Sequence, residues 1–342
     1  MEDKKVVLSV KDLNVKFTLR GQILHAIRGI SLDVYQGESL AIVGESGSGK
    51  SVFVKCAMGL LDANGYIDGG SILYNGMDLT KFQTDKDWLK IRGKEIAMVF
   101  QDPMTSLNPL KTIGKQIQEA VELHQGLKGK DAYQAVLEVL SDVGIDDPER
   151  RYKQYPHEFS GGMRQRVVIA IAVACRPKIL ICDEPTTALD VTIQAQILRL
   201  MNDLQKENGT AIMFITHDLG VINEMADDVV VMYCGQVVEQ APARVIFTNC
   251  EKSHPYTEGL MYSIPRLNDD RKKLDPIPGA VPHPLDLPKG CKFAPRCKYC
   301  TQKCIDAEPE LKQVAEGQYV RCFYPDKEER RSAEHGKIVV HY

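Results

Sequence analysis

The strongest constraint on the fold is a short apolar run followed at once by a glycine-rich loop. The run Ser39–Val43 suits a strand buried in a parallel sheet, and Lys50–Leu61 is predicted to be a helix. The order strand, loop, helix opens an α/β unit. Glycines, a lysine and a hydroxyl residue stand at fixed spacing in the loop, which consists of Gly44, Glu45, Ser46, Gly47, Ser48, Gly49, Lys50 and Ser51.

This loop has the pattern of a phosphate-binding loop. Glycines let the backbone curl so that successive N–H groups face phosphate oxygens, and the helix that follows adds its positive N-terminal end. We expect Lys50 to reach the β- and γ-phosphates and Ser51 to ligate Mg²⁺. A chance glycine-rich turn is the alternative, and the strand before the loop and the helix after it argue against it.

A second apolar strand, Ile179–Cys182, ends in the acidic pair Asp183 and Glu184. A carboxylate at the tip of a buried strand can hold Mg²⁺ through its water shell, so we assign this role to Asp183. Glu184 can then polarise the water that attacks the γ-phosphate. Alone, such a pair is more often a solvated turn, and its combination with the loop carries the interpretation.

A third element, Ser160, Gly161 and Gly162, begins a predicted helix that runs to about Cys175. A hydroxyl and bare backbone donors at a helix start form a second anion site. One nucleotide does not need two such sites on one chain, so this site is expected to serve the nucleotide of a second subunit. By itself the element would be interpreted as a helix cap and turn.

Together these elements resemble the ABC ATPase family over residues 1 to about 240. The family order also includes Gln101, Asp190 at the end of Thr187–Asp190, and His217 within Thr216–Asp218. Met163 stands where the family commonly has glutamine, and Phe159 where it has leucine. Neither departure alters the serine or the two glycines, so contact with ATP should survive.

The resemblance implies a P-loop NTPase fold, a RecA-like α/β core with an antiparallel β part and a helical insert at about 85–160. It implies that Gln101 senses the Mg²⁺ and water site, that His217 contacts the γ-phosphate, and that Asp190 bridges two subunits. In this family an upstream aromatic residue stacks on adenine. Phe17 is the candidate, although His25 is not excluded and a core role for Phe17 is an equal alternative.

The rest of the chain predicts a cassette over 1–245 and a C-terminal extension over 246–342. Strands are expected at Val6–Val10, Asn14–Phe17, Ile30–Val34, Ala211–Ile215 and Val229–Met232, and helices of the insert at Ile113–Leu123 and Asp131–Val143. Seven prolines between 265 and 295 oppose helix and sheet, which predicts an extended segment before a small cysteine-rich lobe.

The extension resembles that of oligopeptide and dipeptide importer ATPases in His254–Leu260, Ile277–Gly279 and Gly290–Cys297. The resemblance implies two integral membrane permease subunits, an extracellular solute-binding protein acting indirectly, and a second ATPase subunit in a homodimer or a heterodimer. Importers of nickel and some sugars share this extension, and an exporter ATPase is a weaker alternative.

Half of the ten cysteines crowd into the last fifth of the chain. In a reducing compartment this clustering suggests a metal more than disulfides. Four thiolates are the usual ligands of a [4Fe–4S] cluster, and the expected set is Cys291, Cys297, Cys304 and Cys322. A Cys₄ zinc site and free thiols remain alternatives. A fifth cysteine, Cys300, could replace one ligand.

Charge and hydropathy restrict the location and the partners. The formal net charge of -3 gives no electrostatic case for nucleic acid, so a cassette protein acting on ribosomes or nucleic acid is a remote alternative. No apolar run approaches the roughly 20 residues that span a bilayer, and the charged start lacks the apolar core of a signal peptide. We expect a peripheral protein on the cytoplasmic face of the cell membrane.

Overall fold

The computed structural model describes residues 4–185, 190–216, 218–248, 251–263 and 276–332. The chain divides into two compact units. The first consists of Met1–Leu8, Asp33–Ser39 and Tyr74–Thr216, and the second of Ser9–Leu32, Leu40–Leu73 and His217–Tyr342. Both units contain residues that the sequence predicts for the nucleotide-binding site.

The first unit contains three parallel strands, β6 (Ile96–Val99), β7 (Ile179–Asp183) and β8 (Ala211–Ile215). Ile179 of β7 lies between Ile96 of β6 and Ala211 of β8, and every residue of the three strands is buried. Strands β7 and β8 were predicted. Strand β6 was not, because a four-residue apolar run does not distinguish a strand from a buried helical turn.

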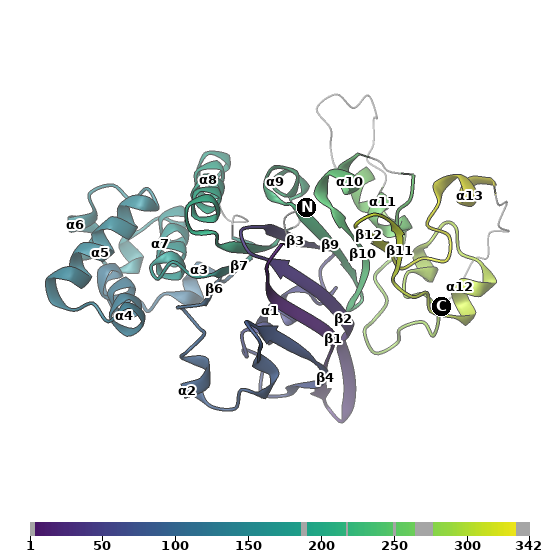
Figure 1. Cartoon of the computed structure of the whole chain (residues 1–342), viewed down its shortest axis with the longest axis horizontal. Helices are drawn as coiled ribbons and strands as arrows, with labels where there is room; N and C mark the ends of the chain where they lie inside the picture. The colour runs from purple at the N-terminus through teal and green to yellow at the C-terminus, as the bar shows by residue number, and fades with distance from the viewer. Residues whose placement is uncertain (1–3, 186–189, 217, 249–250, 264–275, 333–342) are drawn as a thin grey trace. The chain divides into compact units, whose positions relative to one another are not determined.

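Helices α4 (Ile113–Gln125) and α5 (Gly129–Asp142) pack against each other, as their four-residue spacing of buried apolar positions predicts (Figure 1). Helix α7 (Gly161–Val173) contacts both of them and β6. The other elements of this unit are β5 (Met77–Asp78), α2 (Asp85–Trp88), α3 (Pro103–Ser106), α6 (Pro148–Tyr152) and α8 (Val191–Asn208).

Most of strands β2 (Gln22–Tyr35), β1 (Val6–Leu19) and β4 (Gly65–Tyr74) lies in the second unit, in that order across a sheet. Strand β1 is continuous where the sequence predicted two strands. The exposed residues around Asp12 interrupt its apolar alternation, but Asp12 stays in the strand with a φ of 46° while its N–H donates to Ser31 Oγ at 2.9 Å.

Strand β3 (Ser39–Val43) runs parallel to β9 (Asp228–Tyr233), and both were predicted. Helix α1 (Lys50–Ala57) is shorter than the predicted Lys50–Leu61. The helix stops because Gly59 takes a φ of 61° and the Leu60 N–H turns back to the Lys55 carbonyl at 2.8 Å.

The C-terminal extension shares the core of the second unit. Strand β12 (Gln318–Val320) pairs antiparallel with β10 (Gln236–Pro242), which pairs with β9. Tyr256 and Phe293 pack in one apolar cluster with Val43 and Val231. The expectation of a separate small cysteine-rich lobe is therefore not supported, because the extension builds part of the same core.

The extension also holds short elements around β12. They are α10 (Ala243–Phe247), α11 (Pro255–Tyr262), α12 (Gln302–Asp306), β11 (Lys312–Ala315) and α13 (Lys327–Ser332), and α9 (Leu219–Met225) precedes them. Residues 276–293 contain neither helix nor strand, as their prolines predict. Among the described residues, no helix combines the length and the apolar character that a membrane crossing requires.

Candidate nucleotide-binding site

The glycine-rich loop lies tightly against its surroundings at two glycines. Gly44 has a φ of 152°, and a Cβ there would lie 2.2 Å from the Met232 carbonyl oxygen. Gly49 has a φ of 101°, and its Cβ would lie 2.9 Å from Ile27 Cδ1. Both positions require glycine, so the loop has the curled backbone that a row of inward N–H groups needs.

The Lys50 side chain folds back over this loop. Its Nζ donates to the Gly44 carbonyl at 2.7 Å and to the Glu45 carbonyl at 3.0 Å, and the residue is only 8% exposed. Ser46 and Gly47 are exposed and Ser51 is half-buried at the start of α1. The loop therefore holds the Lys50 ammonium group below its exposed residues Ser46 and Gly47, which is an arrangement suited to phosphate.

Glu45 is tethered to the C-terminal extension. Arg296 donates to its carboxylate through both terminal nitrogens, at 2.6 and 3.0 Å, and the Glu45 N–H donates to the Tyr256 hydroxyl at 2.7 Å. Burial alone would lower the pKa of Arg296, but the hydrogen bond to Glu45 raises it above its ordinary value. No local pattern predicts this tether, because its partners stand more than 200 positions apart.

The first unit brings Gln101 and Glu184 together. Gln101 Nε2 donates to Glu184 Oε2 at 2.8 Å, although 83 positions separate the two residues. Glu184 has a φ of 49°, held by a hydrogen bond from its N–H to the Ile215 carbonyl at 2.9 Å. Asp183 is 5% exposed at the end of β7. Gln165 was not among the predicted site residues. Its side-chain amide donates to the carbonyl of Pro185, the residue that follows Glu184, at 2.8 Å.

Two predicted residues cap helices. Ser160 caps α7, its Oγ accepting from the Met163 N–H at 3.3 Å, and it is exposed together with Gly161, while Gly162 is half-buried. Asp190 caps α8 by accepting from the N–H groups of the second and third helical residues. The helix start at Ser160 is thus open to a ligand. The roles toward a second subunit stay predictions.

The adenine-stacking candidates have different surroundings. Phe17 is 9% exposed, and its ring lies 2.5 Å from the position that a Cβ would take on Gly65, which agrees with the alternative of a core role. Its stacking on adenine stays a prediction. His25 is half-buried beside Asn14, with 3.1 Å between Nε2 and Oδ1, and burial lowers its pKa. Predicted catalytic residue His217 lies outside the described residues.

Comparison with known proteins gives the family. A model described as ABC transporter matches residues 27–187, and one described as oligopeptide/dipeptide transporter, C-terminal region, matches 238–304. The chain is 51% identical to the oligopeptide transport ATP-binding protein AppD of Bacillus subtilis, over 94% of this chain and 98% of that protein. It belongs to the ABC transporter ATP-binding subunits of this oligopeptide and dipeptide type.

Other relatives agree. The dipeptide transport ATP-binding protein DppD of Escherichia coli is 47% identical over 93% of this chain and 97% of that protein. A dimeric ATP-binding cassette, MJ0796, solved after hydrolysis with ADP and phosphate, superposes with a TM-score of 0.63 at 27% identity, over 69% of this chain and 99% of that one. The P-loop ABC cassette fold and an ATPase activity follow from this membership.

In this ABC ATPase the four predicted cysteine ligands gather around one cavity. Cys291, Cys297, Cys304 and Cys322 line it, and Cys300 does not. Burial raises the pKa of Cys291 to about 12 and that of Cys322 to about 11. Among the described residues, no group of three or more His, Cys, Asp and Glu side chains is arranged to hold a metal ion.

Proposed function

We propose that this chain is the ATP-hydrolysing subunit of an importer that takes up dipeptides or oligopeptides. The observation that carries the proposal is the hydrogen bond of 2.8 Å from Gln101 to Glu184. It joins the residue expected to sense Mg²⁺ and water to the residue expected to act as general base. An amide on one oxygen of a carboxylate orients the other oxygen, which can then accept a proton from water.

The mechanism uses two cassettes. Each ATP is held by the phosphate loop and Lys50 of one subunit and by the Ser160 helix start of the other, and Asp183 supports Mg²⁺ through its water shell. Glu184 takes the proton from the attacking water as the γ-phosphate leaves. Loss of the γ-phosphate contacts then opens the pair, and the Gln101 segment passes that movement to the membrane partners.

The test is the substitution Glu184→Gln in the full chain. An amide keeps the shape of the side chain but cannot take a proton, so turnover should fall by about two to four orders of magnitude while ATP still binds. Glu138→Gln, an exposed change on α5, is the matched control and should hydrolyse ATP at the wild-type rate. Normal hydrolysis by Glu184→Gln would show that another group is the base.

The peptide assignment rests on the relatives, whose names specify oligopeptide and dipeptide transport. The partners would be a second ATPase subunit, identical or related, and two permease subunits that keep this chain at the cytoplasmic face of the membrane. A solute-binding protein would act through the permeases. Uptake of labelled dipeptides and of nickel by cells that lack this chain separates the two solute classes.

We also propose that the tail cysteines hold a [4Fe–4S] cluster that stabilises the extension. The donor set suits it, because four thiols line one cavity and four thiolates are the usual ligands of such a cluster. Iron and zinc analysis of anaerobically purified protein is the test. Iron with broad visible absorbance supports the cluster, and colourless protein with zinc or no metal rejects it.

A further inference from the structure

Glu45 of the glycine-rich loop is held through both its backbone and its side chain. Its N–H is bound to the Tyr256 hydroxyl, and its carbonyl accepts from Lys50 at 3.0 Å and from the Ser48 N–H at 3.2 Å. Its carboxylate receives two hydrogen bonds from Arg296. Since its single N–H is already used, Glu45 is an anchor of the loop and not one of the donors to phosphate.

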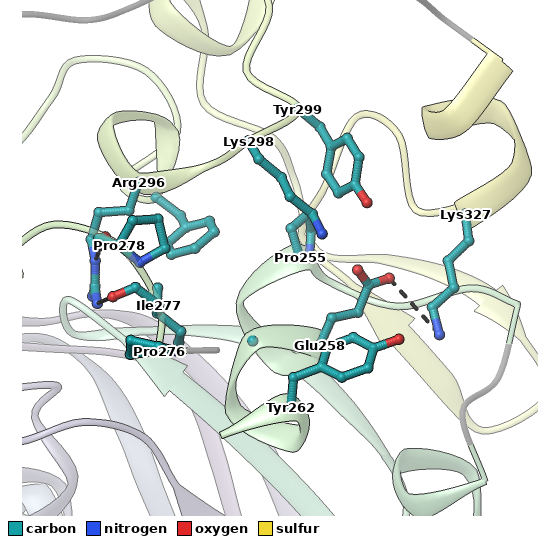
Figure 2. A pocket seen from close by; sticks show the side chains of 12 residues that line it. Pro255, Glu258, Tyr262, Pro276, Ile277, Pro278, Arg296, Lys298, Tyr299 and Lys327 are labelled. Atoms are coloured by element: carbon teal, nitrogen blue, oxygen red, sulfur yellow. Dashed lines mark hydrogen bonds and ion pairs between the residues drawn. The ribbon is translucent and has the colours of Figure 1, made fainter. Parts of the chain in front are cut away.

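Arg296 is itself fixed. Its side chain is 3% exposed, and its Nε donates to the Pro278 carbonyl at 3.0 Å. The guanidinium lies 5.9 Å from the ring centres of both Tyr233 and Phe293. Figure 2 shows Arg296 beside Pro278 and Ile277 in the wall of a pocket of about 510 Å³. A guanidinium held on several sides can impose one position on the carboxylate it binds.

The aromatic residues behind Arg296 are a rigid support. Tyr233, Tyr256 and Phe293 have ring centres 4.7 to 5.4 Å apart, and all three are buried. Tyr233 ends β9, whose Met232 carbonyl closes on Gly44. The extension thus reaches the loop through two contacts on one residue, an ion pair to its side chain and a hydrogen bond to its backbone.

We propose that Arg296 is a positioning residue for ATP binding, which fixes the glycine-rich loop through Glu45 and so makes the C-terminal extension part of the nucleotide site. This rests on the function proposed above. The loop can present its N–H groups to phosphate only in one curled conformation, and Arg296 holds the residue next to its first glycine. Without the ion pair, the free loop would populate several conformations. ATP binding would then have to restrict the loop to one of them, which weakens the affinity for ATP.

The test compares Arg296→Lys with a matched control, Arg330→Lys. Arg330 is also a buried arginine of the extension, paired with the Glu258 carboxylate that lines the pocket of Figure 2. Within the described part of the chain, its guanidinium donates to the Ser253 carbonyl and the Glu258 carboxylate and not to the glycine-rich loop. The measurements are the Kd for Mg-ATP by calorimetry and the melting temperature, both on the full chain. Lysine keeps the charge but cannot make two parallel hydrogen bonds.

We expect Arg296→Lys to raise the Kd about three- to tenfold, the size of one lost ordinary hydrogen bond, because lysine keeps the charge and one contact to Glu45. Arg330→Lys should lower the melting temperature and leave the Kd unchanged. Glu45→Gln, a milder change on the loop side, should raise the Kd in the same way, and the double variant Glu45→Gln with Arg296→Lys should bind no more weakly than the weaker single variant.

Other outcomes overturn the proposal. An unchanged Kd in Arg296→Lys and in Glu45→Gln would make Arg296 a structural residue of the extension only. An equal rise of the Kd in Arg330→Lys would mean that general loosening of the extension, and not the tether, affects the site. If the wild-type chain itself binds no ATP, the proposed function fails. Wild-type binding thus tests the function, and the change of the Kd in the variants tests the tether.

Discussion

Replacing Gly44 with alanine tests how the loop is built. At 152°, the φ of Gly44 is one that residues with a Cβ rarely adopt, and the new atom would stand 2.2 Å from the Met232 carbonyl oxygen, well inside the 3.0 Å that real Cβ atoms keep. The carbonyl belongs to β9, which pairs with β3 directly before the loop. Either the loop or the strand pair must shift.

Gly47→Ala is the matched control. Gly47 also has a positive φ, 79°, but a Cβ there would meet no atom within 4 Å. Its cost is the backbone strain alone, about 1–2 kcal/mol. Gly44→Ala adds the clash, typically about 1–3 kcal/mol for forced overpacking, and so totals about 2–5 kcal/mol.

Thermal unfolding of the full chain measures the difference. At about 2–4 °C per kcal/mol for chains of a few hundred residues, Gly47→Ala should melt about 2–8 °C below the wild type and Gly44→Ala clearly lower still. Gly44→Ala should also bind Mg-ATP more weakly, because the Gly44 carbonyl positions Lys50. Equal melting temperatures for the two variants would refute the close approach of Gly44 to β9.

Two further predictions concern buried carboxyl groups of the second unit. Burial raises the pKa of the fully buried Glu239, so its contribution to stability is complete below the ordinary carboxyl pKa and is lost as the pH rises through the raised value. Melting curves at pH 4 and pH 8 should therefore show Glu239→Gln gaining stability relative to the wild type at pH 8, and an unchanged difference would contradict this. Arg330→Met should lower the free energy of unfolding by about 3–5 kcal/mol, because it leaves Glu258 buried without its main partner; a urea titration that shows a loss below about 1 kcal/mol would contradict it.

Hydrophobic patterns of a few residues correctly predicted the strands whose own sequence marks them as buried. The five-residue runs of β3 and β8 are fully buried, so their apolar character alone marked them. Strand β1 was divided in two because Asp12 breaks the alternation, yet the Asp12 N–H donates to Ser31 Oγ of the neighbouring strand β2 and Asp12 stays in the sheet. The end of α1 depends on one left-handed glycine, a signal that hydrophobic periodicity does not contain.

The site shows the same division. The loop residues and the Asp183–Glu184 pair could be predicted because each follows a recognisable strand. The role of Gln101 at the Mg²⁺ and water site came only from the family resemblance, and its hydrogen bond to Glu184 was not predicted, since nothing local relates residues 83 positions apart. The tether of Glu45 to Arg296 and Tyr256 could not be predicted at all, because a salt bridge across 251 positions leaves no periodic trace.

The pairing of β10 with β12 affects how this protein can be divided. A chain cut after residue 245 would keep every motif of the cassette, yet one side of β10 would lose its neighbour and offer unpaired backbone groups to other chains. It would also lose the rings of Tyr256 and Phe293, which pack in one apolar cluster with Val43 and Val231. Such a fragment should aggregate, so the minimal active unit of this ATPase is longer than its motifs suggest.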